Sequence, residues 1–225
     1  MTAQRAASRS LELFGLEAAG EPEAKTLAPG AVLLHGLAAA RAPLLLSALE
    51  QILRRAPFRH MATPGGLRMS VAMTNCGTAG WVSDRRGYRY DRADPQSGQR
   101  WPAMPEIFAA LATEAAAMAG FKHLSPDACL VNRYAPGTRL SLHQDRNEQD
   151  FTAPIVSVSL GLPAMFLFGG LRRAERAARV PLTHGDVVVW GGPSRLRFHG
   201  VLPLQDGIHP LTGPCRLNLT FRWAL

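Results

Sequence analysis

The chain has 225 residues, of which 47% are hydrophobic, with 21 glycines and 17 prolines. This length favours one domain with a sizeable core, and the many turn formers favour a β-containing fold over a helical bundle. The formal net charge of +8 favours polyanionic partners. Nearly all of the positive charge comes from arginine, since only Lys25 and Lys122 are lysines. A genome rich in G and C would also enrich arginine, which is a second explanation for the charge. No run of about 18 apolar residues occurs, which excludes an apolar membrane-spanning helix.

The first 30 residues mix arginine, glutamate and alanine and lack the apolar run of a secretory signal. We expect residues 1–30 to form a partly ordered tail and residues 31–225 to form a single domain. Cys76, Cys129 and Cys215 are odd in number and far apart, which argues against a disulfide framework and a zinc finger. We therefore expect reduced thiols in a cytoplasmic protein. We also expect the protein to be a monomer.

Two helical segments precede a region of short strands. Apolar residues recur every three or four positions in Pro43–Arg55 and Pro105–Ala119, which predicts two amphipathic helices. From residue 126 onward, apolar runs alternate with turns rich in glycine and proline. The predicted strands are Ala128–Tyr134, Leu140–Asp145, Ile155–Leu160, Met165–Phe168, Asp186–Trp190, Arg197–Val201 and Arg216–Trp223. This order predicts an α+β, mainly β fold: a double-stranded β-helix (jelly roll) over about residues 126–225, supported by N-terminal helices.

His143 and Asp145 lie two positions apart in a predicted strand, so their side chains point to the same face. His199 lies on a later predicted strand that can pair beside them. Two histidines and one carboxylate on one face of an octahedral metal leave three positions open, as in non-haem Fe(II) oxygenases. Catalytic zinc sites use the same ligand types, and a histidine and an aspartate at this spacing also occur as surface pairs. The pattern alone leaves all three interpretations open.

The last predicted strand, Arg216–Trp223, alternates polar and apolar residues. Its period of two puts Arg216 and Arg222 on one face, with the polar residues between them. Buried arginines need an anionic partner. A dicarboxylate between the two would supply one, because arginine grips a carboxylate through two parallel hydrogen bonds. An edge strand that turns its polar face to water would show the same pattern.

Several long runs between about Phe58 and Arg222 carry a family resemblance. They are Met61–Gly66, Met69–Gly77, Asn132–Gly137, Ser141–Asp145, Ile155–Ala164, Phe168–Leu171, His184–Gly192 and Asn218–Arg222. These runs resemble the AlkB family of Fe(II)- and 2-oxoglutarate-dependent dioxygenases. The resemblance implies that His143, Asp145 and His199 are the catalytic Fe(II) ligands, with 2-oxoglutarate and O2 as co-substrates.

The resemblance also assigns the residues that hold 2-oxoglutarate. It implies that Arg216 pairs with the distal carboxylate, helped by Tyr134, and that Arg222, Asn132 and Asn218 hold the end that chelates the metal. The implied reaction is oxidative demethylation of N-alkylated bases, 1-methyladenine and 3-methylcytosine, in single-stranded DNA or RNA, with release of formaldehyde. A hydroxylase or demethylase of the same chemistry, acting on protein or a small metabolite, is the alternative.

Residues 58–92 are predicted to form a nucleotide-recognition lid. Within it, Trp81–Tyr90 interleaves aromatic and basic residues, a pattern that can stack a base and bind its phosphates but is also that of an ordinary β-hairpin. The resemblance implies that Trp81 stacks on the flipped base and that Tyr88 contacts its phosphate. It also places Thr63 and Arg173 on the path of the nucleic acid.

One position departs from the family pattern. Two residues beyond Asp145 the family has a second aspartate, and this chain has Asn147. Strand periodicity lets the side chain of Asn147 reach the base. An amide is neutral and can donate as well as accept a hydrogen bond. We therefore expect Asn147 to reduce the advantage of cationic lesions over neutral ones.

Overall fold

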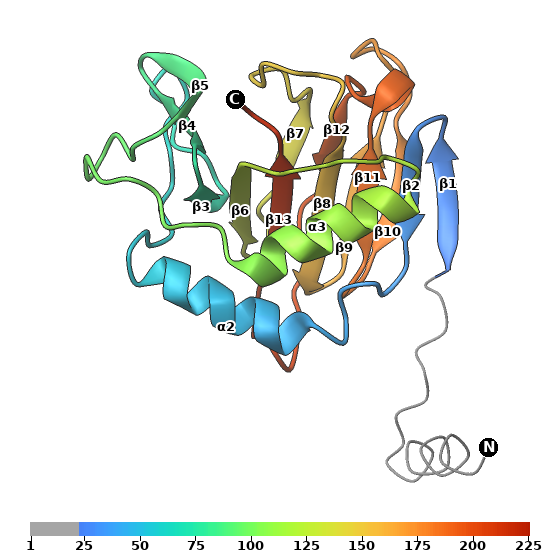
Figure 1. The fold of residues 1–225 in the computed structure, drawn as a ribbon, viewed down its shortest axis with the longest axis horizontal. Coiled ribbons are helices and arrows are strands. Elements are labelled where there is room, and N and C mark those ends of the chain that lie inside the picture. The colour runs from blue at the N-terminus through green and yellow to red at the C-terminus, as the bar shows by residue number, and fades with distance from the viewer. Residues whose placement is uncertain (1–22) are drawn as a thin grey trace, which may run out of the picture.

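The computed structural model describes residues 23–225, which form two antiparallel sheets, a hairpin and two helices (Figure 1). The larger sheet has the strand order β1 (Ala24–Ala28), β2 (Ala31–Leu34), β11 (Val187–Trp190), β8 (Ile155–Gly161), β13 (Arg216–Arg222), β6 (Ala128–Tyr134) and β3 (Ala72–Gly77). The smaller sheet has the order β10 (Ala178–Leu182), β9 (Ala164–Phe168), β12 (His199–Val201) and β7 (Leu140–His143). The hairpin consists of β4 (Gly80–Asp84) and β5 (Gly87–Asp91). This arrangement confirms the predicted mainly β jelly-roll fold.

Helices α2 (Ala42–Leu53) and α3 (Glu106–Met118) lie side by side on one face of the larger sheet (Figure 1). Each helix buries residues at the predicted spacing: Leu45, Leu49 and Ile52 in α2, and Phe108, Leu111 and Ala115 in α3. Phe108 of α3 meets Phe221 of β13 edge-on, with ring centroids 5.9 Å apart. Burying a side chain of this size stabilises the fold by about 2 kcal/mol. The helices therefore cover the sheet face that the alternating leucines and Phe221 of β13 turn outward.

The strand period of two separates a dry core from a polar pocket. Leu217, Leu219 and Phe221 of β13 pack in the cluster under the helices, whereas Arg216 and Asn218 line a cavity on the opposite face. Apolar residues of both sheets close the space around that cavity. They include Leu33, Leu130, Ile155, Phe166, Phe168, Val180, Leu182, Val188 and Trp190. The polar face of the last strand is thus turned inward, not to water.

The predicted boundaries of the tail and of the lid are wrong, and one strand of the smaller sheet was not predicted. Residues 24–28 were assigned to the tail but form β1, which pairs with β2 at the edge of the larger sheet; residues 1–22 of that tail lie outside the described residues. The range 58–92 is not one separate lid, because β3 inside it pairs with β6 and is buried at five of six positions. Strand β10 was not predicted, because its mixed, mostly exposed sequence with Pro181 is typical of an edge strand.

The two predicted helices are present, with ends that differ from the prediction by one or two residues. Among residues 23–225, no helix is long and apolar enough to span a membrane.

Candidate active site

Strands β7 and β12 bring the two predicted histidine ligands together. His143 and His199 are direct cross-strand partners, with ring centroids 4.3 Å apart. A register irregularity follows at Gly200, where a β-carbon would lie 2.7 Å from the Leu140 carbonyl oxygen, so glycine permits this close approach. Asp145 completes the cluster, and one ligand atom from each of the three residues lies within 4.8 Å of the others.

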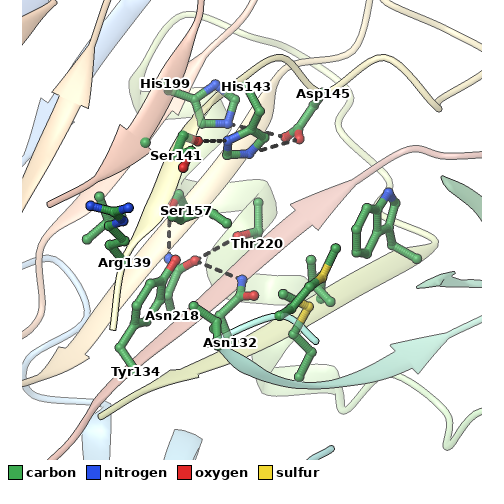
Figure 2. Close-up of a pocket in the computed structure, with 18 of the residues that line it drawn as sticks. Asn132, Tyr134, Arg139, Ser141, His143, Asp145, Ser157, His199, Asn218 and Thr220 are labelled. Atoms are coloured by element: carbon green, nitrogen blue, oxygen red, sulfur yellow. Dashed lines mark hydrogen bonds and ion pairs between the residues drawn. The ribbon is translucent and has the colours of Figure 1, made fainter. Parts of the chain in front are cut away.

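The hydrogen bonds of the two rings fix their tautomers. Nδ1 of His143 lies 2.9 Å from the Ser141 carbonyl oxygen, and Nδ1 of His199 lies 3.0 Å from that of Arg197. A carbonyl only accepts, so each Nδ1 carries the proton and each Nε2 keeps a free lone pair. The two Nε2 atoms face Asp145 at 3.8 and 3.7 Å, the dashed lines at the top of Figure 2. Both imidazoles therefore present the atom that binds metal.

The electrostatics keep these groups in their ligand forms. Burial, reinforced by the neighbouring His143, lowers the pKa of His199 to about 4. Burial would raise the pKa of the Asp145 carboxyl, but the charge of Arg222 opposes it and holds that pKa well below its usual range. At neutral pH the site thus offers a neutral imidazole and an ionised carboxylate, which bind a divalent cation without first losing a proton.

The donor set fits a metal with open coordination positions. Two imidazoles and one carboxylate lie on the wall of a cavity of about 420 Å³. A structural zinc site closes with a fourth protein ligand, and within residues 23–225 no fourth histidine, cysteine or carboxylate joins the cluster. The arrangement is that of a facial triad with room for further ligands.

Arg216 is a buried cation without a carboxylate partner. Its side chain is 1% exposed, and its Nη2 donates to the Ser159 hydroxyl at 2.9 Å. Its Nε and Nη1 have no partner among the described residues, and the guanidinium lies over the Tyr134 ring at 5.0 Å. Burying unsatisfied charged donors is costly. A carboxylate bound in this cavity would satisfy them, so the cavity fits the distal end of 2-oxoglutarate.

Four polar side chains of β6, β8 and β13 form a cluster in the wall of the same cavity. Asn132 Nδ2 and the Thr220 hydroxyl both donate to Asn218 Oδ1, at 3.3 and 3.0 Å. Asn218 Nδ2 donates to the Ser157 hydroxyl at 2.8 Å and to the Val158 carbonyl at 3.1 Å. Figure 2 shows this cluster below the three metal ligands. Both amide hydrogens of Asn218 are therefore used within the protein, whereas Asn132 keeps one for a ligand.

Arg222 lines the same cavity but has carboxylate partners within the protein. Its Nε and Nη2 donate to Asp145 Oδ2 at 3.0 and 2.7 Å, and its Nε lies 3.3 Å from Glu148 Oε1. Glu148 also accepts the Tyr90 hydroxyl at 2.8 Å and pairs with Arg195 Nη2 at 3.1 Å. The two inward arginines of β13 thus differ: Arg222 orients a metal ligand, and Arg216 lacks an anion.

Glu148, Arg195 and Tyr90 were not predicted as site residues. Glu148 follows Asp145 by three positions, beyond the end of β7, where a period of two no longer tells which way a side chain points. Arg195 lies in the turn after a short 3₁₀ helix, Gly192–Ser194, and shows no periodicity. The sequence offered one chemical indication of such a residue. An arginine predicted to be buried on β13 needs a carboxylate partner elsewhere in the chain.

Removing Glu148 should destabilise the protein strongly. Glu148 and Arg195 have side chains 1% and 3% exposed. We expect Glu148→Ala to lower the free energy of unfolding by about 3 kcal/mol or more, because it leaves Arg195 buried and unpaired. Urea unfolding measures this, with Glu175→Ala as the control, since Glu175 pairs with an arginine that is 86% exposed. An equal loss of unfolding free energy in Glu148→Ala and Glu175→Ala would contradict the role of Glu148 as the buried partner of Arg195.

An aromatic pair from the hairpin lines the cavity. Trp81 of β4 and Tyr88 of β5 stack with ring centroids 5.7 Å apart and an interplanar angle of 14°. Both belong to the cavity wall, as does Asn147. The Asn147 amide contacts the Trp81 indole nitrogen and the Tyr88 carbonyl oxygen. The structure thus brings three of the five predicted substrate residues into the same cavity as the triad.

The other two predicted substrate residues lie outside the cavity wall. Thr63 closes a turn, in which its hydroxyl accepts the Leu67 backbone N–H at 3.1 Å. Arg173 is exposed, and its Nη1 donates to the Leu142 carbonyl oxygen, next to His143, at 2.7 Å. Arg173 is therefore at the rim of the metal site, and Thr63 shapes an exposed loop.

Comparison with known proteins decides the family. A family profile described as the 2OG-Fe(II) oxygenase superfamily matches residues 30–222. Over 214 residues the chain is 56% identical to the alpha-ketoglutarate-dependent dioxygenases AlkB of Escherichia coli (strain K12) and Salmonella typhimurium (strain LT2), covering 95% of this chain and 98% of each relative. The chain belongs to the AlkB family.

The fold of this AlkB-family chain also matches a solved structure. The structure of OsALKBH1 has a TM-score of 0.79 and 32% identity, covering 89% of this chain and 99% of that one. Shorter matches include a DNA N(6)-methyladenine demethylase, ALKBH1D, of Arabidopsis thaliana, 46% identical over 44% of this chain and 25% of the relative. They also include a tRNA demethylase, abh1, of Schizosaccharomyces pombe, 41% identical over 41% of this chain and 32% of the relative.

Family membership confirms the predicted enzyme class and cofactors. The protein is a 2-oxoglutarate-dependent dioxygenase that uses Fe(II), 2-oxoglutarate and O2. His143, Asp145 and His199 are the side chains that would hold the iron. Arg216, with its two unpartnered donors, is the residue that fits the distal carboxylate of the co-substrate.

Proposed function

We propose that this dioxygenase demethylates N-alkylated bases, 1-methyladenine and 3-methylcytosine, in single-stranded DNA or RNA, with release of formaldehyde. The observation that carries the proposal is the stacked Trp81–Tyr88 pair in the wall of the cavity that holds the metal triad. The demethylase names of the shorter AlkB-family matches support the same substrate class. We also propose that the protein acts as a monomer in the cytoplasm.

The residues of the chain bind and orient the reactants. When bound, Fe(II) together with 2-oxoglutarate and O2 supplies the oxidant that hydroxylates the methyl group. Arg216 binds one carboxylate of 2-oxoglutarate, and Asn132 donates its remaining amide hydrogen to the other end. Arg222 holds Asp145 in place through two hydrogen bonds.

Apolar side chains exclude water around the reacting groups. Met73, Leu130, Phe166 and Trp190 line the cavity and are at most 8% exposed. Their packing lowers the local dielectric, which strengthens the pairing of Arg216 with a bound carboxylate. A methylated base that is unpaired enters such a pocket at low cost, because it need not be taken out of a Watson–Crick pair.

The rim of the cavity suits the phosphates of a nucleic acid strand. Arg139 lines the cavity, and Arg173 donates to the Leu142 carbonyl oxygen beside His143. Further exposed arginines lie in the turn of the hairpin and in the loop after β7: Arg85, Arg86 and Arg146. Because bases methylated at N1 of adenine or N3 of cytosine are cationic, stacking on Trp81 gains a cation–π contribution of about 1 kcal/mol. Arginines for phosphate and an aromatic ring for the base are the combination that single-strand binding requires.

The test is demethylation of short methylated oligonucleotides. With iron, ascorbate and 2-oxoglutarate, mass spectrometry should show the loss of one methyl group and the formation of formaldehyde. Binding should weaken by about tenfold or more between about 50 and 200 mM salt if the strand makes three phosphate contacts. Trp81→Ala should reduce the preference for methylated over unmethylated strands, because stacking is lost.

The same experiment distinguishes the alternative substrates. A protein that consumes 2-oxoglutarate but neither binds nor demethylates oligonucleotides would instead act on protein or a small metabolite. A Trp81→Ala variant that keeps the full preference for methylated strands would show that the indole does not stack on the lesion.

A further inference from the structure

Asn147 joins the hairpin to the loop that carries Asp145. Its Oδ1 accepts a hydrogen bond from the Trp81 indole Nε1 at 3.1 Å, and its Nδ2 donates to the Tyr88 carbonyl oxygen at 3.3 Å. An indole N–H only donates and a carbonyl only accepts, so the chemistry of the two partners fixes the orientation of the amide. One exposed side chain therefore bridges both strands of the hairpin to the metal-ligand loop.

The other hydrogen bonds of Trp81 hold its backbone and do not involve its indole ring. Its N–H donates to Asn75 Oδ1 and its carbonyl accepts from Asn75 Nδ2, both at 3.0 Å, and Asn75 is fully buried. The indole face stacks on Tyr88. Within residues 23–225, the one hydrogen bond of the indole ring is donated by its Nε1 to Asn147 Oδ1. That bond selects the side-chain torsions at which the ring rests.

The hairpin is pinned separately at a second place. Tyr90 lies directly across from Trp81 in the register of β4 and β5. Its hydroxyl donates to the buried carboxylate of Glu148 at 2.8 Å. Loss of the Asn147 contact would thus release the indole ring and the outer part of β5 without freeing the hairpin as a whole.

We propose that Asn147 is a positioning residue that presets the Trp81 indole as a stacking platform in the cavity wall. The inference rests on the proposed function, because the platform needs a base to stack on. A ring held in its binding orientation loses less conformational freedom when the base arrives. A carboxylate at position 147 could accept from the indole but would repel the Tyr88 carbonyl oxygen, so both halves of the amide are needed. This role differs from direct hydrogen bonding of Asn147 to the base.

The first measurement needs no substrate. The indole N–H resonance of Trp81 is the signal that disappears in Trp81→Phe. We expect Asn147→Ala to shift this resonance, because its acceptor is removed, and the neighbouring Gln149→Ala to leave it in place. Gln149 is also exposed, and its backbone N–H, which the substitution keeps, donates to the Ala224 carbonyl oxygen at 3.1 Å. If the Trp81 resonance stays in place in Asn147→Ala, the indole does not donate a hydrogen bond to Asn147 and the proposal is wrong.

The second measurement is a double-mutant cycle on the iron- and 2-oxoglutarate-loaded enzyme. Asn147→Ala should raise the KM for a 1-methyladenine oligonucleotide about fivefold, the effect of one lost hydrogen bond. The KM for 2-oxoglutarate should not change. In a Trp81→Phe background, which has no indole N–H, Asn147→Ala should add little, because coupled residues are not additive. Gln149→Ala is again the control.

A positioning role and a base-reading role predict different results. If Asn147 acts through Trp81, Asn147→Ala raises the KM for cationic 1-methyladenine more than the KM for neutral 1-methylguanine, because the cation–π contribution of the positioned indole is lost. A larger rise for the neutral lesion than for the cationic one, or full additivity with Trp81→Phe, would overturn the platform. Wild-type enzyme that consumes 2-oxoglutarate but demethylates no oligonucleotide would overturn the proposed function and the platform together, and the indole resonance would still report the contact.

Discussion

Replacing His143, Asp145 or His199 with alanine should each abolish turnover of 2-oxoglutarate. A site with three protein ligands leaves half of the octahedral positions to co-substrates, so two ligands are too few to retain the metal. Asp145→Ala should have a second effect. Arg222 would lose the carboxylate that accepts two of its hydrogen bonds, so this variant should also be less stable than the histidine variants.

Succinate release and bound iron are the measurements for these variants. His123→Asn is the matched control: His123 is an exposed histidine away from the cavity, and asparagine tolerates its positive φ of 70°. We expect the control to keep its iron and its activity. Any one of the three ligand variants with full activity and a full complement of iron would show that the triad is assigned wrongly.

Strand periodicity predicted the direction of those site residues that lie within a strand. The period of two in β13 correctly turned Arg216 and Asn218 inward and the apolar residues outward. The predicted strand Leu140–Asp145 ends at His143 in the structure, so Asp145 reaches the triad from the loop after β7 and not through strand periodicity. The pairing of His143 with His199 needed the tertiary fold, because nothing local fixes which strands become neighbours. The resemblance to the AlkB family supplied that link.

Other parts of the site could not be predicted for identifiable physical reasons. Glu148 lies in a loop, where side-chain direction follows no period, and its importance comes from Arg195, which is distant in sequence. The edge strands β1 and β10 are too exposed or too short to show a clear pattern. For Asn147, residue type suggested a contact to the base, whereas the structure shows its amide bonded to the hairpin.

The strand pattern alone predicts the same role, carboxylate binding, for Arg216 and Arg222 of β13. Their spacing predicts one dicarboxylate between them, but Asp145 and Glu148 already accompany Arg222. The buried charges of Asp145, Glu148, Arg195 and Arg222 balance within the protein. Among the buried arginines of the described residues, Arg216 is the one without a carboxylate partner, so it should depend most on the co-substrate.

Arg216→Ala should therefore raise the KM for 2-oxoglutarate by on the order of 100-fold, because a desolvated charge pair is lost. Arg216→Lys should recover part of that loss: an ammonium supplies the charge but not the planar pair of donors. Arg133→Ala is the control, since Arg133 is the exposed arginine cross-strand from Leu217 and stacks on Phe58 outside the cavity.

Stability gives an independent readout for the same variant. Without co-substrate, Arg216 is buried with two unsatisfied donors, so Arg216→Ala should lose much less stability than Glu148→Ala, which breaks a satisfied pair. Adding 2-oxoglutarate under anaerobic conditions should raise the Tm of the wild type, because a ligand that binds only the folded state stabilises it. The same concentration should leave the Tm of Arg216→Ala almost unchanged. An unchanged KM, or an equal rise in Tm for both proteins, would show that the co-substrate carboxylate is bound elsewhere.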